Sequence, residues 1–250
     1  MPARIAHLSD IHFGANDAKI VDSTVAWLQE QRPDLVIISG DFTQRARIAQ
    51  FRQAAAWLNR LRADGHNILA VPGNHDVPLY DVVRRFAAPL RRYKRWISSD
   101  LCPWFESESV AVLGINTARS LTFRDGRINH DQMKLIERSF AAVAPEKTRI
   151  LVTHHPLFAM PIGRGGELSE AVGRHEDAVK AVCRARDGRA GQRYCGRIER
   201  AAQCRGGFAV PPADLAFALL PCRRVLLLQR HRMGGRKRRH HRRFILAGLA

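Results

Sequence analysis

The sequence predicts an α/β protein in which apolar strands alternate with amphipathic helices. Short runs of β-branched and aliphatic residues recur along residues 1–183, and segments with helical spacing of apolar residues separate them. Four of these runs also stop at polar residues of kinds that bind metal ions. Regular alternation of this sort is typical of the α/β class. The chain has 250 residues, 46% of them apolar, which is sufficient for one domain with a sizeable core.

The expected elements follow one another in a simple order. Strands are predicted at Ile5–Leu8, Leu35–Ile38, Asn67–Val71, Val110–Ile115 and Arg149–Val152. Helices are predicted over about Asp17–Gln31, Ala46–Leu61, Asp81–Ile97 and Asp131–Val143. The pairs Pro33-Asp34 and Asp64-Gly65 favour turns between a helix and the next strand. We expect Asn129 or His130 near the cap of the last helix, and no internal repeat is visible.

The strand ends carry the most informative residues. After the strand that ends at Val71, Pro72-Gly73 stops the extended chain, and an amide, an imidazole and a carboxylate follow at Asn74, His75 and Asp76. Three other strands end in the same manner, at Asp10-Ile11-His12, Gly40-Asp41 and His154-His155-Pro156. Taken singly, an Asp can cap a turn, Gly-Asp is ordinary turn chemistry and a His can belong to the core. Taken together, they predict a metal site assembled from strand termini.

These motifs resemble those of the calcineurin-like metallophosphoesterases, most closely the bacterial branch that includes the class III cyclic-nucleotide phosphodiesterases. The family pattern is Asp-x-His, Gly-Asp, Gly-Asn-His-Asp/Glu, His and Gly-His-x-His, and the first four blocks are present here. Gly114-Ile-Asn-Thr117 and the Gly126–Gln132 segment also look like the family's middle region. The resemblance covers about residues 3–183. It implies a four-layer αββα sandwich, with two facing sheets flanked by helices, which is incomplete at the C-terminus.

The resemblance also implies a role for each site residue. Asp10 and His12 would bind one divalent ion, Asn74 and His154 would bind a second, and Asp41 would bridge the two. Imidazole, carboxylate and amide ligands suit Fe, Mn or Zn better than a soft metal, and no cysteine takes part. Two ions held by one carboxylate suit the clamping of a phosphodiester. The remaining roles implied are those of a general acid and substrate contact for His75, a substrate contact for Asn74, and positioning of His75 or His154 by Asp76 and His155.

The fifth block of the family pattern is missing. No Gly-His-x-His occurs in the chain, although the family places it on a strand end soon after the helix around residues 175–183. That block supplies one imidazole to each metal, so both ions would lose a ligand here. The later His231, His240 and His241 do not reproduce its spacing.

The charge distribution changes where the pattern is lost. Residues 1–183 contain 24 Lys and Arg against 20 Asp and Glu, whereas residues 184–250 contain 17 against 3, so most of the net charge of +18 lies in the last quarter. Four of the five cysteines also fall from position 183 onward. We therefore predict a metallophosphoesterase domain at 1–183 and a divergent, poorly ordered Arg-rich tail at 184–250. The tail is either a basic arm for nucleic acid or anionic lipid, or the product of a reading-frame slip near residues 184–190, which we favour.

The function implied by the resemblance is metal-dependent hydrolysis of a small-molecule phosphodiester such as a 3′,5′-cyclic nucleotide. Two other classes stay open: a catalytically impaired remnant of such an enzyme, and a basic nucleic-acid-binding protein. Metal content separates the first two, and salt-dependent binding to DNA or RNA identifies the third. We expect no specific nucleic-acid partner.

We expect a cytoplasmic protein of bacterial type that does not associate with membranes. The first residues already belong to a predicted strand, which leaves no room for a signal peptide, and no apolar run is long enough to span a bilayer. Five cysteines, an odd number without paired metal-binding spacing, argue against a disulfide framework.

Overall fold

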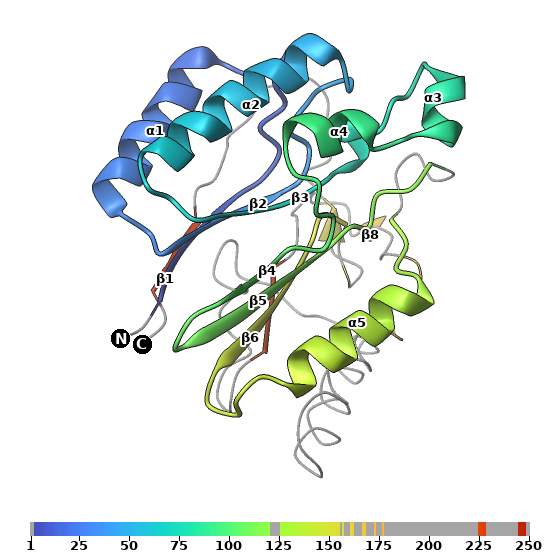
Figure 1. Ribbon diagram of the computed structural model, residues 1–250. Helices are drawn as coiled ribbons and strands as arrows, with labels where there is room; N and C mark the ends of the chain where they lie inside the picture. The colour runs from blue at the N-terminus through green and yellow to red at the C-terminus, as the bar shows by residue number, and fades with distance from the viewer. Residues whose placement is uncertain are drawn as a thin grey trace.

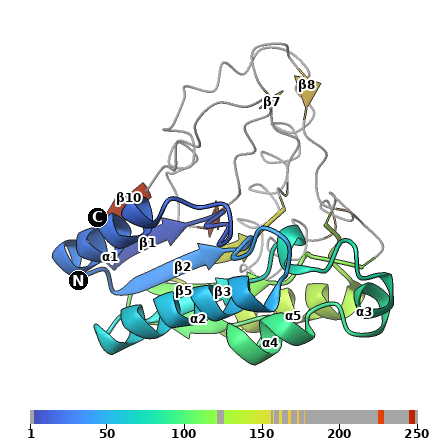
Figure 2. The ribbon, with the colours of Figure 1, turned by 90° about the horizontal axis from the view of Figure 1, so that it is seen from above.

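The computed structural model is a four-layer sandwich in which two β-sheets face each other and helices cover their outer faces (Figures 1 and 2). One sheet has the strand order β10-β1-β2-β3, the other has the order β4-β5-β6-β9, and β7 and β8 pair separately. The predicted αββα architecture is therefore confirmed. The structure describes residues 3–120, 126–155, 157, 161–162, 167–168, 173, 177, 225–228 and 245–248.

The elements follow the predicted alternation. The first half of the chain contains β1 (Arg4–Leu8), α1 (Ala18–Gln31), β2 (Leu35–Ser39), α2 (Ile48–Ala63), β3 (Ile68–Val71), the 3₁₀ turn η1 (Asn74–Asp76), α3 (Val82–Ala87) and α4 (Arg91–Trp96). The second half contains β4 (Trp104–Glu106), β5 (Val110–Ile115), α5 (His130–Ala141), β6 (Thr148–Thr153), β7 (Pro161–Ile162), β8 (Glu167–Leu168), β9 (Val225–Leu228) and β10 (Ile245–Gly248).

Three apolar layers hold the sandwich together, because side chains alternate between the two faces of each strand. In β2, Leu35 and Ile37 point between the sheets, where they meet Val112 and Ile150 of the second sheet. Val36 and Ile38 of the same strand pack instead against the layer formed by α1, α2 and α4. The outer face of the second sheet packs on α5 (Figure 1). β2, β5 and β6 are buried on both faces, which explains their almost uninterrupted apolar sequences.

The local capping chemistry fixes where the helices begin. Asp17 caps α1 by accepting a hydrogen bond from the Lys19 backbone N–H. Asn129 caps α5, as predicted, and it exchanges hydrogen bonds with Gln132 in a capping box.

One helix prediction was wrong. The basic run over Asp81–Ile97 is not one helix but two short ones, α3 and α4. Pro89 lies between them, and a proline disfavours helical geometry in the residue before it. The edge strand β4, which pairs antiparallel with β5, was not predicted at all.

Two segments beyond residue 183 join the sheets. β9 pairs in parallel with β6, and β10 pairs antiparallel with β1. Most of residues 184–250, including all three later histidines, lies outside the described residues, so the domain boundary at 183 stays a prediction. In the described part of the chain, no helix has the length and apolar character needed to cross a bilayer.

Candidate metal centre

The predicted site residues meet at one edge of the sandwich because of strand direction. β1, β2 and β3 run in parallel, so their carboxyl ends lie at the same edge of the first sheet. β6 of the second sheet runs in parallel with β5 and delivers His154, whose ring reaches across to the first sheet. The structure thus brings together all five predicted metal ligands.

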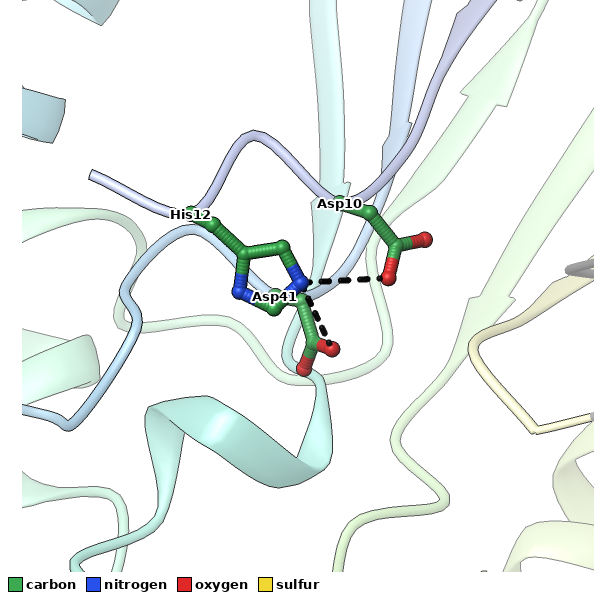
Figure 3. A group of neighbouring side chains, drawn as sticks. All are labelled: Asp10, His12 and Asp41. Atoms are coloured by element: carbon green, nitrogen blue, oxygen red, sulfur yellow. Dashed lines mark ion pairs between the residues drawn. The ribbon is translucent and has the colours of Figure 1, made fainter. Parts of the chain in front are cut away.

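The loops after β1 and β2 remain hydrogen-bonded to each other beyond the strands. The backbone N–H of Asp10 donates to the carbonyl of Gly40 at 3.2 Å, and that of His12 donates to the carbonyl of Asp41 at 2.9 Å. This pairing places three ligand side chains beside one another, with Asp10, His12 and Asp41 pointing toward a common centre (Figure 3). Their ligand atoms all lie within 4.8 Å of one another.

The backbone at these three residues adopts a conformation that side chains rarely accept. Asp10, His12 and Asp41 have φ angles of 61°, 52° and 55°, in the left-handed region. Such conformations cost about 1–2 kcal/mol each and are frequent at functional sites. The surrounding strands and hydrogen bonds therefore hold a strained arrangement whose effect is to aim the three side chains inward.

Asp41 lies between two groups of ligand atoms. Its Oδ2 lies 3.6 Å from Nε2 of His12, which is itself 3.4 Å from Oδ1 of Asp10. Its Oδ1 lies 3.4 Å from Nε2 of His154. The carboxylate of Asp41 is fully buried. It therefore faces one group with each oxygen, as a bridging ligand must.

The second group is formed by His154 and Asn74. Nδ1 of His154 donates a hydrogen bond to the carbonyl of Ser39 at 2.8 Å, which leaves Nε2 of the neutral ring as an acceptor. That Nε2 faces Oδ1 of Asn74 at 3.1 Å and Oδ1 of Asp41 at 3.4 Å, both of them acceptors. Acceptor atoms converging at such distances require a cation or a proton between them.

These separations fit a bound metal ion. Nitrogen and oxygen ligands at about 2.0–2.2 Å from a metal lie about 3–3.5 Å apart when the ligand–metal–ligand angle is near 90–110°. The four separations given above, two from His12 and two from His154, are 3.1–3.6 Å. The hydrogen bond of His154 to a backbone carbonyl is the usual way in which a metal-binding imidazole is oriented.

His75 differs in its surroundings from His12 and His154, the two histidines with predicted ligand roles. Its Nδ1 donates to the carbonyl of Gln44 at 2.8 Å, and its backbone N–H donates to Oδ1 of Asp41 at 2.9 Å. Its ring packs edge-on against the ring of His12, with the centroids 4.8 Å apart. The hydrogen bond at Nδ1 fixes the ring and leaves Nε2 as the nitrogen for a ligand.

Asp76 connects the loop after β2 to the loop after β3, a role that the sequence did not indicate. We predicted that it positions His75 or His154, but the hydrogen bonds that we find on its carboxylate come from the backbone N–H groups of Gly73, Phe42 and Thr43 and from the Thr43 hydroxyl. Burial and the neighbouring Asp41 carboxylate raise the pKa of Asp76 to about 7, against the effect of the backbone N–H donors. Asp76 thus ties the loop after β2 to the loop after β3.

His155 packs against His154, with ring centroids 4.9 Å apart, and its Nδ1 lies 2.7 Å from Oγ1 of Thr117. The role of His155 in positioning His154 stays a prediction. Sequence reasoning did not single out Ser39, Thr43 or Gln44, since two of these act through backbone carbonyls and the third through contacts between loops.

A pocket of about 550 Å³ opens beside the metal-site residues. His12 and His75 line it, together with Gln44, Arg45, Arg47 and other residues of the same loops. It is large enough for a small-molecule substrate.

A curated protein whose sequence matches part of this chain is the glycerophosphodiester phosphodiesterase GpdQ of Enterobacter lignolyticus (strain SCF1). The two chains are 34% identical over 84 residues, a segment that spans 29% of this chain and 29% of that relative's length.

Solved structures share the fold at low sequence identity. A dimetal phosphatase from Danio rerio superimposes with a TM-score of 0.53 and 11% identity over 73% of this chain and 78% of its own. The purple acid phosphatase PPD1 of yellow lupin (Lupinus luteus) gives a TM-score of 0.52 and 18% identity over 74% of this chain and 36% of its own. These likenesses support the sandwich fold.

The model of the calcineurin-like phosphoesterase family matches residues 3–185, which include every predicted ligand. The match ends close to the point where the family motifs are lost from the sequence. The fold, the ligand-bearing strand ends and this match agree, and the chain belongs to the calcineurin-like phosphoesterase family of hydrolases.

Proposed function

We propose that this protein hydrolyses phosphodiesters with the help of two divalent metal ions. The observation that carries the proposal is the position of Asp41, whose two carboxylate oxygens face two separate groups of ligand atoms. In this arrangement Asp10 and His12 would hold one ion, and Asn74 and His154 would hold the other. The ions, when bound, would activate water and neutralise charge on the phosphate.

His75 would act on the leaving group. Its ring lines the pocket and packs against the ring of His12, and the Gln44 carbonyl fixes the orientation of the ring. A protonated Nε2 in this position would donate its proton to the departing oxygen. Asn74 and His75 would also contact the phosphate, since both follow the end of β3.

The substrate proposal rests on two likenesses. The partial match to GpdQ favours a glycerophosphodiester, and the family branch that the motifs resemble favours a 3′,5′-cyclic nucleotide. Both are phosphodiesters, so the reaction is the same. We propose Fe, Mn or Zn as the metal, because imidazole and carboxylate ligands suit these ions. We further propose a small molecule, and no specific nucleic acid, as the partner.

The proposal is tested by adding metals back to chelator-treated protein and measuring hydrolysis of bis(p-nitrophenyl) phosphate, cyclic AMP and glycerophosphocholine. We expect turnover with Mn²⁺, Fe²⁺ or Zn²⁺, low in the chain as written and higher where Gly-His-x-His is restored, that is lost on chelation and in Asp41→Asn. Hydrolysis that persists after chelation, or that Asp41→Asn retains, would contradict the proposal.

A further inference from the structure

The pocket beside His75 carries positive charge that the proposed reaction does not use. Arg45 and Arg47 line this pocket together with the metal-site histidine His12. Among its described lining residues there is no carboxylate, and the first turn of α2, which begins at the pocket, has no acidic residue. The walls of the pocket therefore favour the binding of an anionic group, in addition to the phosphodiester that the metal ions would hold.

The loop that carries the two arginines is held rigidly. His75 donates a hydrogen bond to the carbonyl of Gln44, and the Gln44 N–H donates to the carbonyl of Phe13. Ala46, at a φ of 49°, donates its N–H to Oγ1 of Thr43 and accepts a hydrogen bond from Arg92 at its carbonyl. A strained loop with so many backbone partners presents its side chains in a fixed position.

Gln50 supports both arginines and is itself nine-tenths buried. Its Oε1 accepts the backbone N–H groups of Arg45 at 2.9 Å and of Arg47 at 3.3 Å. Its amide nitrogen lies against Gly14, another pocket residue, where a Cβ would come within 2.2 Å of that nitrogen. No hydrogen bond from this Nε2 to another described residue is found, so its N–H groups are available to a ligand at the wall of the pocket.

The arginine side chains are available for a ligand. Both are exposed, and neither forms an ion pair with a carboxylate of the described residues. The guanidinium of Arg45 lies over the ring of Tyr80 at 5.8 Å from its centroid, which orients it without neutralising its charge. A guanidinium with free N–H groups binds phosphate or carboxylate through two parallel hydrogen bonds.

We infer that Arg45 and Arg47, with Gln50, bind a second anionic group of the substrate, a phosphate or carboxylate, in the pocket beside the scissile phosphodiester. The inference rests on the proposed function, which places the scissile diester at the metal ions beside this pocket. It narrows the substrate class to phosphodiesters that carry another negative charge on one of their alcohol groups. A plain cyclic nucleotide has no such group and would be a poorer ligand.

The test measures binding separately from hydrolysis. Three ligands are titrated calorimetrically into the Mn²⁺-supplied full chain: methyl propyl phosphate, and the same diester with a terminal phosphate or a terminal carboxylate on the propyl group. The ligands are recovered after each titration and analysed for hydrolysis, so that heat from turnover is not mistaken for heat from binding. The protein is compared with R45Q/R47Q, with R45K/R47K and with the matched control R52Q, whose arginine lies on α2 over Trp96.

We expect the native chain to prefer a ligand with the added anion, and whichever of phosphate and carboxylate binds more tightly identifies the group. In R45Q/R47Q this preference should fall by about tenfold or more, the usual value of charge-assisted hydrogen bonds. R45K/R47K should keep part of the preference, which shows that the fold survives, and R52Q should keep all of it.

Equal loss of affinity for all three ligands, or an effect of R52Q as large as that of R45Q/R47Q, would overturn the inference. The inference would also be overturned if the native chain bound the ligands with the added anion no more tightly than methyl propyl phosphate. Failure of the proposed function looks different: no nitrophenyl diester is hydrolysed with any metal, while the calorimetric preference still depends on Arg45 and Arg47.

Discussion

At the scale of single residues, neighbouring side chains of the site have different proposed roles, as Asp41 and His75 show. Asp41, fully buried between His12 and His154, is the residue that both groups of ligand atoms need. We predict that Asp41→Asn lowers the metal content of the purified protein toward zero, because both ions lose a charged ligand. Asp10→Asn should remove mainly one ion. Elemental analysis of the two variants measures this, and equal losses would rule out the bridging assignment.

His75 lies next to a ligand in sequence but is held by a backbone carbonyl. His75→Ala should therefore leave the metal content close to that of the native protein. Turnover should fall by about 10²–10⁴-fold, the usual contribution of general acid–base catalysis. The loss should be smaller for a nitrophenyl ester than for an alkyl ester, since nitrophenolate leaves without a proton. A large drop in bound metal would show that His75 is a ligand.

The meeting of the candidate ligand residues at one site was predictable because each directly follows an apolar run that is typical of a strand. Parallel strands deliver such residues to one edge regardless of the details of packing. The residues that support them were not predictable. Ser39 and Gln44 act through backbone carbonyls, and any residue has one, so their roles arise only from the tertiary arrangement of the loops.

At the scale of elements, tight approaches between strand ends set the site geometry. Gly40 has a φ of 87°, and a Cβ there would lie 2.5 Å from Nδ1 of His154 and 2.8 Å from the backbone of Gly73. Gly65 has nearly the same φ, 84°, yet a Cβ there would meet nothing within 4 Å. The two glycines therefore share the cost of a left-handed conformation and differ only in crowding.

This pair permits a controlled prediction. Gly65→Ala should cost about 1–2 kcal/mol of unfolding free energy from backbone strain alone. Gly40→Ala should cost roughly 1–3 kcal/mol more, because the added methyl group displaces His154 or Gly73. Chemical denaturation in the presence of a chelator measures both changes without a contribution from metal. Gly40→Ala should also bind less metal, whereas the same cost for both variants would mean that the site is not closely packed here.

Helices and strands were predicted well where the periodicity of apolar residues was strong. They were predicted poorly where a single residue determined whether an element continued. The apolar strands and α1, α2 and α5 were found within a few residues of their bounds. The run over Asp81–Ile97 kept its helical spacing on either side of Pro89, so the break was overlooked. β4 is three residues long and half-exposed, and its pairing with β5 is a long-range contact that no local pattern reports.

At the scale of the whole molecule, the second sheet takes its last strand from the Arg-rich region. β9 lies beside β6 in parallel, with Val152 opposite Leu228, so the last residue of β9 lies at the edge of the sheet where β6 delivers His154. The family pattern requires Gly-His-x-His on a strand end after residue 183, and the sequence has none. His231 follows the end of β9 by three residues, outside the described part of the chain.

We predict that the chain as written has little or no phosphodiesterase activity, because each proposed ion lacks one imidazole. We also predict that it is poorly soluble, because the divergent region would leave part of the apolar core of residues 3–183 uncovered. The comparison is with a version whose reading frame is corrected near residue 190 so that Gly-His-x-His is restored. Both are purified, supplied with Mn²⁺ and assayed with a nitrophenyl phosphodiester. The corrected protein should be soluble, should bind more metal and should react markedly faster. If the two rates are comparable, the frame-slip hypothesis is wrong. In that case some of the histidines at 231, 240 and 241 must complete the site, and replacing each of them by alanine in the chain as written should show which ones the activity needs.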